Sequence, residues 1–131
     1  MSHNTNIFLV DDHPIVRNGL KALIERLGNY KVTGEYDNGE ELMNDYPFSD
    51  NKPDLIIMDL MMPVMAGTEA TRAIRALEVP WSNLPIIAFT AGAFEHDRED
   101  ARSSGMAGFL EKPVRLNRMR EVLLEHLGPA S

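Results

Sequence analysis

Residues 55–63 of the chain read LIIMDLMMP, in which four consecutive apolar residues end abruptly at a carboxylate, Asp59. A short apolar run of this kind is typical of a strand buried on both faces, as in a parallel sheet. Asp59 then lies at the carboxyl end of a central strand, which is where open α/β sheets bind their ligands. This stretch therefore predicts both a fold class and the location of a site.

Three other apolar runs end in polar residues in the same way: residues 7–10 before Asp11 and Asp12, residues 86–89 before Thr90, and residues 108–111 before Lys112. The carboxyl ends of parallel strands meet at one edge of a sheet, so we expect these side chains to converge with Asp59. Three carboxylates, one hydroxyl and one ammonium would then share that edge.

Segments with helical periodicity separate the apolar runs. We expect strands at about residues 6–11, 30–36, 55–59, 84–90 and 108–111, and helices at about 14–27, 39–46, 68–77, 95–102 and 115–127. This alternation predicts a single α/β domain over residues 1–131, with a core of about 6–127 and helices on both faces of a parallel sheet. The segment 95–102 is polar nearly all round, so that helix should gain little from burial.

The first helix carries two further expectations. Asp12 is an N-cap candidate, and Pro14 is tolerated in a first turn. We expect one apolar face to be buried, formed by Ile15, Leu20, Leu23, Ile24 and Leu27.

Composition limits the function classes. The net charge is −7, which argues against nucleic-acid binding by this domain because phosphate backbones need a basic face. There is no cysteine, which excludes thiol and disulfide chemistry, and no apolar run approaches the length of a membrane span. Residues 1–6 have no signal-peptide character, so a cytoplasmic location is expected.

The cluster itself predicts a chemistry. Asp11, Asp12 and Asp59 repel one another, and a divalent cation relieves that repulsion; an all-oxygen ligand set favours Mg²⁺. Lys112 and Thr90 can each bind a phosphoryl oxygen. A carboxylate nucleophile with these partners is typical of phosphoryl transfer, whose product would be an aspartyl phosphate on Asp59.

Each residue also has an ordinary explanation when taken alone. Asp12 could cap a helix, Lys112 could be a solvated surface residue, and Thr90 could serve a turn. The pattern taken as a whole favours a shared site over these separate explanations, because each residue follows a different apolar run. The four histidines show no ligand spacing, so we expect structural or exposed roles: His3, His13, His96 and His126.

These motifs, in this order, resemble the receiver domain of two-component response regulators and phosphorelays, over about residues 6–127. The segments that carry the resemblance are residues 9–13 (LVDDH), 59–67 (DLMMPVMAG), 89–91 (FTA) and 109–113 (FLEKP). The resemblance implies a three-layer, flavodoxin-like (βα)5 fold, similar to chemotaxis regulators, with strand order 2-1-3-4-5. It describes a signalling domain and not an enzyme in its own right.

The resemblance also implies residue roles. Asp59 accepts the phosphoryl group, Thr90 and Lys112 hold its oxygens, and Lys112–Pro113 is a cis peptide. The family pattern implies that Mg²⁺, or Mn²⁺ in its place, is bound by the carboxylates of Asp12 and Asp59 and by the backbone carbonyl of Met61. Asp11 contacts the cation through a water. Thr90 and Phe109 form the switch that changes the surface of the fourth helix, last strand and last helix.

The implied partners are a sensor histidine kinase or histidine phosphotransfer protein, and a downstream protein or fused output domain. A homodimer through the last helix and the absence of membrane contact are further expectations. Residues 11–20 resemble receivers attached to helix-turn-helix output domains, whereas residues 90–91, 97–99 and 104–106 resemble receivers of hybrid histidine kinases.

Three positions depart from the common family pattern. Ala66 stands where Asp is frequent, and Phe109 lacks the hydroxyl of the commoner Tyr. Met61 would place an apolar side chain beside the phosphate, where it cannot orient an attacking water. We therefore expect autodephosphorylation to be slow at most.

Three alternatives remain open. A phosphohydrolase of the haloacid dehalogenase type needs an Asp where Met61 stands. A flavin carrier needs a phosphate loop free of carboxylates after the first strand, whereas this chain has Asp11 and Asp12 there. A receiver-like interaction module that is never phosphorylated would not need the complete acidic set and Lys112.

Overall fold

The computed structural model describes residues 5–28, 30–46, 50, 52–60, 65–77, 80–91 and 95–128. Its strands are β1 (Thr5–Val10), β2 (Tyr30–Tyr36), β3 (Leu55–Asp59), β4 (Ile86–Thr90) and β5 (Gly108–Glu111). Its α-helices are α1 (Pro14–Arg26), α2 (Gly39–Asp45), α3 (Gly67–Arg75), α4 (Glu95–Ser104) and α5 (Leu116–Leu127), and a short 3₁₀ helix, η1 (Pro80–Asn83), precedes β4.

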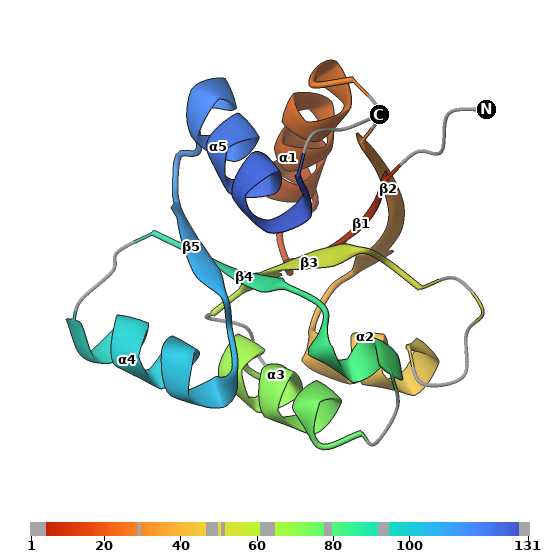
Figure 1. The fold of residues 1–131 in the computed structure, drawn as a ribbon, viewed down its shortest axis with the longest axis vertical. Coiled ribbons are helices and arrows are strands. Elements are labelled where there is room, and N and C mark those ends of the chain that lie inside the picture. Colours follow the sequence, from red (N-terminus) through yellow and green to blue (C-terminus); the bar gives the residue numbers. More distant parts are fainter. Residues whose placement is uncertain are drawn as a thin grey trace.

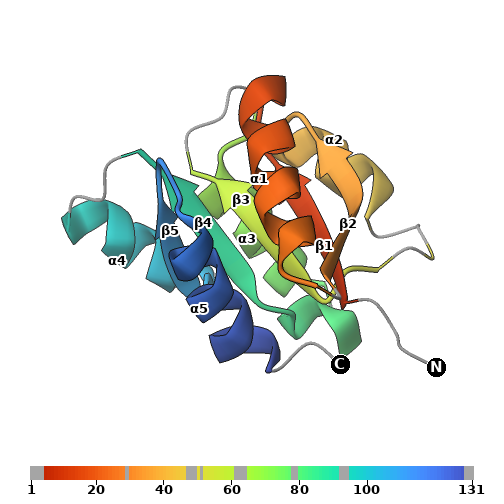
Figure 2. The ribbon, with the colours of Figure 1, turned by 90° about the horizontal axis from the view of Figure 1, so that it is seen from above.

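The five strands form one parallel sheet in the order β2-β1-β3-β4-β5. Helices α1 and α5 cover one face of this sheet, and α2, α3 and α4 cover the other (Figure 1). The view from above shows α1 and α5 lying along the strands (Figure 2). The predicted α/β class and the strand order implied by the resemblance are both confirmed.

The core consists of two apolar clusters, one on each face of the sheet. Residues such as Leu9 and Ile57 pack against α1 and α5, whereas Phe8 and Met58 pack on the opposite side. Every residue of β3 and of β4 is buried. This double burial explains why these strands are continuous apolar runs with no alternation of polar residues.

The start of α1 differs from the prediction in two respects. His13, and not Asp12, occupies the N-cap position, and its side chain makes no capping hydrogen bond. Ile15 is 86% exposed, whereas Leu20 and Ile24 are buried. A helix turns by about 100° per residue, so Ile15 lies roughly opposite Ile24 and does not share its face.

Helix α4 is two residues longer than expected and ends before Gly105, whose φ of 108° favours glycine. Arg75 of α3 donates to the carbonyl of Gly105 from Nε (3.2 Å) and Nη2 (2.8 Å), and from Nη1 to that of Ser82 (2.6 Å). Burial lowers the pKa of Arg75, and burial also raises the pKa of Tyr46 to about 12. In the part of the chain that the structure describes, no helix has the length and apolar character of a membrane span.

Candidate functional site at the carboxyl edge of the sheet

The register of the central strands brings the predicted carboxylates together. Val10 of β1 lies beside Met58 of β3, so the next residues, Asp11 and Asp59, follow at equivalent positions. Asp11 is 1% exposed and Asp59 is 2% exposed. Oxygens of these two residues and of Asp12, together with a ring nitrogen of His13, all lie within 4.8 Å of one another.

Lys112 supplies the positive charge at this cluster. Its Nζ lies 3.3 Å from Asp59 Oδ2 and 3.5 Å from Asp11 Oδ2. The backbone fixes its place, because the Lys112 amide donates to the carbonyl of Thr90 (2.8 Å). The Lys112–Pro113 peptide bond is cis, as the resemblance implies.

Thr90 is the last residue of β4 and is 4% exposed. Its strand lies between β3, which ends at Asp59, and β5, which precedes Lys112. Thr90 therefore shares the carboxyl edge of the sheet with these residues, as the sequence predicts. Met61 falls outside the residues that the structure describes.

The donor atoms at this edge suit a divalent cation. Asp11 Oδ2 and Asp12 Oδ1 are buried without a hydrogen-bond partner among the described residues. A ring nitrogen of His13 lies 3.1 Å from Asp11 Oδ1 and 3.1 Å from Asp12 Oδ1, but its geometry satisfies a hydrogen bond only toward Asp11. Buried carboxylate oxygens in this condition are costly unless a cation binds them, and oxygen-only ligands favour Mg²⁺.

Gly67, the first residue of α3, allows this helix to begin in close contact with the end of β3. A Cβ atom at Gly67 would lie 2.4 Å from the carbonyl oxygen of Asp59, which is closer than non-bonded atoms approach. The amide of Gly67 also lies near the end of β3, donating to the carbonyl of Leu60 at 3.3 Å. Only glycine permits this close approach of the helix to the strand that carries Asp59.

Sequence reasoning missed two residues at this edge, His13 and Arg17. His13 follows the paired aspartates directly, and that adjacency was the signal that could have found it. Arg17 of α1 donates from Nη1 to the backbone carbonyl of Asp11 (2.5 Å). The sequence carries no comparable signal for Arg17, because a long side chain one turn into a helix can point in several directions.

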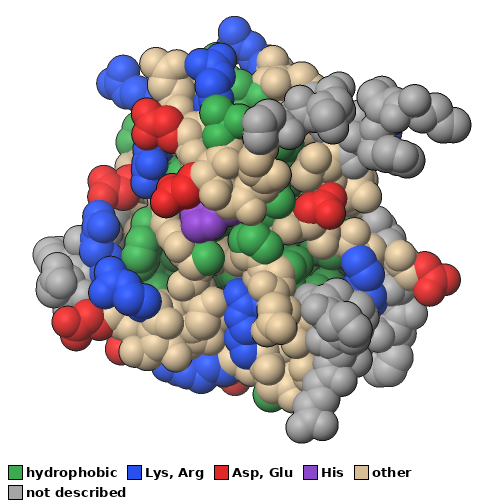
Figure 3. All heavy atoms as spheres, viewed as in Figure 1, with side chains coloured by type: hydrophobic (Ala, Val, Ile, Leu, Met, Phe, Trp, Pro, Cys, Tyr) green, Lys and Arg blue, Asp and Glu red, His purple; other side chains and the backbone are tan. Residues whose placement is uncertain are grey.

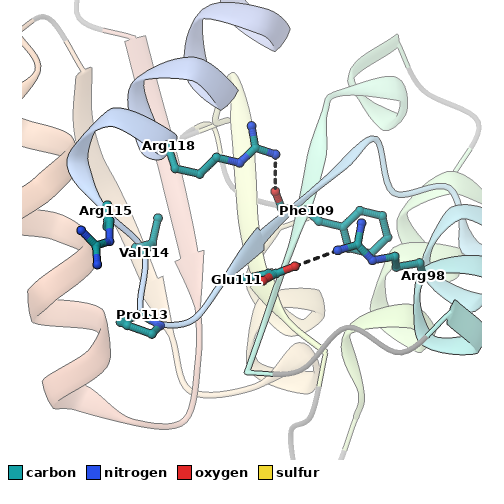
Figure 4. A pocket seen from close by; sticks show the side chains of 7 residues that line it. All are labelled: Arg98, Phe109, Glu111, Pro113, Val114, Arg115 and Arg118. Atoms are coloured by element: carbon teal, nitrogen blue, oxygen red, sulfur yellow. Dashed lines mark hydrogen bonds and ion pairs between the residues drawn. The ribbon is translucent and has the colours of Figure 1, made fainter.

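Phe109, the predicted switch aromatic, lies away from this cluster on β5. The guanidinium carbon of Arg98 lies 5.1 Å from the centre of its ring, and Arg98 Nη2 also pairs with Glu111 Oε1 (2.7 Å). Arg118 Nη2 lies 3.3 Å from the Phe109 carbonyl oxygen, to which it donates (Figure 4). These contacts join α4 and α5 to β5 at Phe109 and Glu111.

A surface pocket of about 360 Å³ opens at this junction. Its lining combines three arginines with one glutamate and three apolar residues: Arg98, Arg115, Arg118, Glu111, Phe109, Pro113 and Val114. Lys and Arg side chains lie among Asp and Glu side chains at the left margin of Figure 3, over the region where Figure 1 places α4 and β5. The pocket is thus lined by three arginines and one glutamate, on a chain whose net charge is −7.

Comparison with known proteins identifies relatives of two kinds. Bacillus subtilis transcriptional regulatory protein YdfI is 37% identical over 107 residues, which are 81% of this chain and 47% of YdfI. Sensor protein GacS of Pseudomonas syringae is 34% identical over 131 residues, which are 98% of this chain and 14% of GacS. The chain spans less than half the length of these curated relatives.

Solved structures of similar fold cover nearly the whole chain. The receiver domain of the Pseudomonas aeruginosa sensor histidine kinase PA1611, solved with a magnesium ion in its active site cleft, superposes with a TM-score of 0.82. It is 34% identical, and the match covers 96% of this chain and 99% of that domain. The chemotaxis protein CheY4 of Vibrio cholerae gives a TM-score of 0.83 at 25% identity, covering 95% and 99%.

The family model for the response regulator receiver domain matches residues 7–124. This range includes all five strands except the first residues of β1, and most of α5. It also includes the whole acidic edge, from Asp11 to Lys112. The chain therefore belongs to the response regulator receiver domain family.

Proposed function

We propose that this chain is a phosphoacceptor domain in which Asp59 receives a phosphoryl group from a phosphohistidine. The donor would be a sensor histidine kinase or a histidine phosphotransfer protein. The observation that carries this proposal is the convergence of Asp11, Asp12 and Asp59 with Lys112 at one sheet edge, in a chain of the receiver family. A lone carboxylate at a strand end would not support it.

A divalent cation would be held by the carboxylates of Asp12 and Asp59 and the backbone carbonyl of Met61, with Asp11 acting through a water. The oxygens of Asp11 and Asp12 that lack hydrogen-bond partners support this assignment. Mg²⁺ fits these ligands, as would Mn²⁺. When bound, the cation supplies positive charge that offsets the negative charge of the transferring group and its acceptor.

The chain's own residues would share the remaining work. A carboxylate oxygen of Asp59 forms a P–O bond as the P–N bond to the donor imidazole breaks; the imidazole leaves with the electron pair and takes up a proton. Lys112 Nζ, now 3.3 Å from Asp59, would donate to a phosphoryl oxygen. The hydroxyl of Thr90 would bind a second one.

Phosphorylation would then change the surface formed by α4, β5 and α5. Thr90 would move toward the new phosphate, and Phe109 would turn inward beside it. Arg98 supports a coupled response, because it contacts both the Phe109 ring and Glu111. The arginine-lined pocket at this surface would change shape as Phe109 leaves it.

The relatives suggest the setting in which the domain works. YdfI and GacS are a transcriptional regulator and a sensor protein, so we propose a downstream partner that is either fused or separate. The acidic charge favours a partner protein over nucleic acid as the direct contact. We further propose a cytoplasmic location and pairing of two copies through the α5 surface.

The test is incubation with a small phosphodonor and Mg²⁺, followed by intact mass spectrometry. The proposal expects one added phosphoryl group in the wild type and none in Asp59→Asn. Asp54→Asn is the matched control, since Asp54 is exposed and precedes β3, and it should still be modified. Steady release of phosphate at high turnover would favour a phosphohydrolase, and an unmodified wild type would favour an inert interaction module.

The lifetime of the phosphate is a second prediction at this site. Because the Met61 thioether is only a weak hydrogen-bond acceptor and cannot orient an attacking water, Met61→Asn should hasten loss of the phosphoryl group by about tenfold. The decay of phosphorylated protein, followed by mass spectrometry after removal of the donor, measures this. Met61→Leu is the control and should decay at the wild-type rate. Equal lifetimes for the Asn and Leu variants would contradict the prediction.

A further inference from the structure

Arg17 of α1 connects the ends of two strands. Its Nη1 donates both to the backbone carbonyl of Asp11 (2.5 Å) and to Asp37 Oδ1 (2.5 Å), just after β2. Its Nε lies 3.5 Å from Glu35 Oε1. The Arg17 side chain is 15% exposed, whereas its partners Glu35 and Asp37 are 33% and 54% exposed.

The main chain of Asp11 is thereby held on both sides. Its amide donates to the carbonyl of Tyr36 (3.0 Å), and its own carbonyl accepts from Arg17. The Asp11 carboxylate accepts in turn from the amide of His13 (2.8 Å). These hydrogen bonds hold the peptide groups on both sides of Asp11, and the orientation of these groups determines the direction in which the side chains of Asp11 and Asp12 leave the backbone.

We propose that Arg17 is a positioning residue that orients Asp11 and Asp12 for divalent-cation binding. This inference rests on the proposed function, because it assumes that the edge binds Mg²⁺. It assigns Arg17 no direct contact with cation or phosphate. Residues behind the ligands of a metal commonly control affinity in this way, by limiting ligand motion.

Two effects of Arg17 on a cation have opposite signs, which makes the inference testable. As a positive charge near the edge, Arg17 would repel Mg²⁺, so its removal would tighten binding. As a positioning group, it would favour Mg²⁺, so its removal would weaken binding. Asp37 at 2.5 Å and Glu35 at 3.5 Å surround the guanidinium with two carboxylates that offset its charge. We therefore expect the positioning effect to exceed the repulsion.

The experiment is calorimetric titration of the metal-free full chain with MgCl₂, well below its unfolding temperature. Arg17→Gln should raise the Kd for Mg²⁺ by about tenfold, the lower end of the roughly 10–100-fold range for groups behind metal ligands. Lys21→Gln is the matched control, because Lys21 lies one turn later and pairs with the same Glu35 (3.9 Å). It removes the same charge without touching Asp11 and should change the Kd less than twofold. A Kd for Arg17→Gln equal to or below that of Lys21→Gln would overturn the inference.

Two further variants keep the test valid if Arg17→Gln does not fold. Arg17→Lys retains the positive charge, but its side chain is one bond shorter and cannot place a nitrogen where Nη1 lies between Asp11 and Asp37, so it should also weaken Mg²⁺ binding several-fold. Asp37→Asn leaves the hydrogen bond from Arg17 to Asp11 in place but weakens the contact that holds the guanidinium. We therefore expect a smaller loss of Mg²⁺ affinity than in Arg17→Gln. Wild-type affinity in Arg17→Lys would show that charge alone matters, which overturns the inference. A wild type that binds no Mg²⁺ would instead refute the proposed function.

Discussion

At the scale of single residues, Lys112 is the group on which the stability of the edge depends. Asp11 and Asp59 are almost fully buried, and Lys112 Nζ lies within 3.5 Å of an oxygen of each. A buried carboxylate without a positive partner is costly. Lys112 therefore stabilises the metal-free fold as well as serving the proposed transfer.

Lys112→Met should reduce the free energy of unfolding of the metal-free protein by about 1–3 kcal/mol, because two buried carboxylates lose their cation. Mg²⁺ should recover much of this loss, since it supplies charge at the same place. Urea unfolding with EDTA and with saturating Mg²⁺ measures both effects. Lys31→Met, at an exposed position on β2, should cost little and show no larger response to Mg²⁺ than the wild type. Equal losses in the two variants would contradict this account.

The sequence predicted the residues that end strands but not those that reach the site from a helix. Asp59 and Lys112 were predictable because a parallel sheet brings strand ends to one edge, whatever the details of packing. The contact of Arg17 with Asp11 depends on the rotamer of a long side chain, which helical periodicity does not specify. Asp12 was open to interpretation as a cap because caps and ligands use the same residue types.

At the scale of elements, α4 is attached differently at its two ends. Near its carboxyl end, Ala101 and Ser104 are buried, and Arg75 binds the carbonyl of Gly105. Toward its amino end, Arg98 makes an ion pair with Glu111 whose side chains are 36% and 62% exposed. Exposed ion pairs contribute little stability. The sequence predicted this weakly buried helix from its polar composition, but the clamp by Arg75 required tertiary contacts.

Arg98→Ala should therefore loosen α4 without unfolding the domain. We expect backbone amides of residues 95–104 to exchange several-fold faster, while global stability falls by no more than about 1 kcal/mol. Hydrogen exchange followed by mass spectrometry measures the exchange rates in this segment, and urea unfolding measures the free energy of unfolding of the whole domain. Arg120→Ala, on the exposed side of α5, is the control and should leave α4 unchanged. Exchange in α4 at the wild-type rate would mean that Arg98 does not hold the helix.

At the scale of the whole molecule, two kinds of electrostatic repulsion act together. The chain carries a net charge of −7, and three of its carboxylates are concentrated at one edge. Simple salt screens the general repulsion between distant surface charges. It does not satisfy buried oxygens that lack a hydrogen-bond partner, which are Asp12 Oδ1 and Asp11 Oδ2, although Lys112 Nζ lies 3.5 Å from the latter.

Mg²⁺ should consequently stabilise the protein more than NaCl of the same ionic strength. Binding to the native state alone contributes about 2.7 kcal/mol at a free concentration one hundred times the Kd. Asp12→Asn should remove this specific part, while the smaller effect of NaCl remains. Glu125→Gln, in the last turn of α5 at the opposite end of the sheet, removes the same charge and should keep the Mg²⁺ response. Thermal unfolding in matched MgCl₂ and NaCl measures all four cases; identical curves for the two salts in the wild type would show that the edge responds to ionic strength alone.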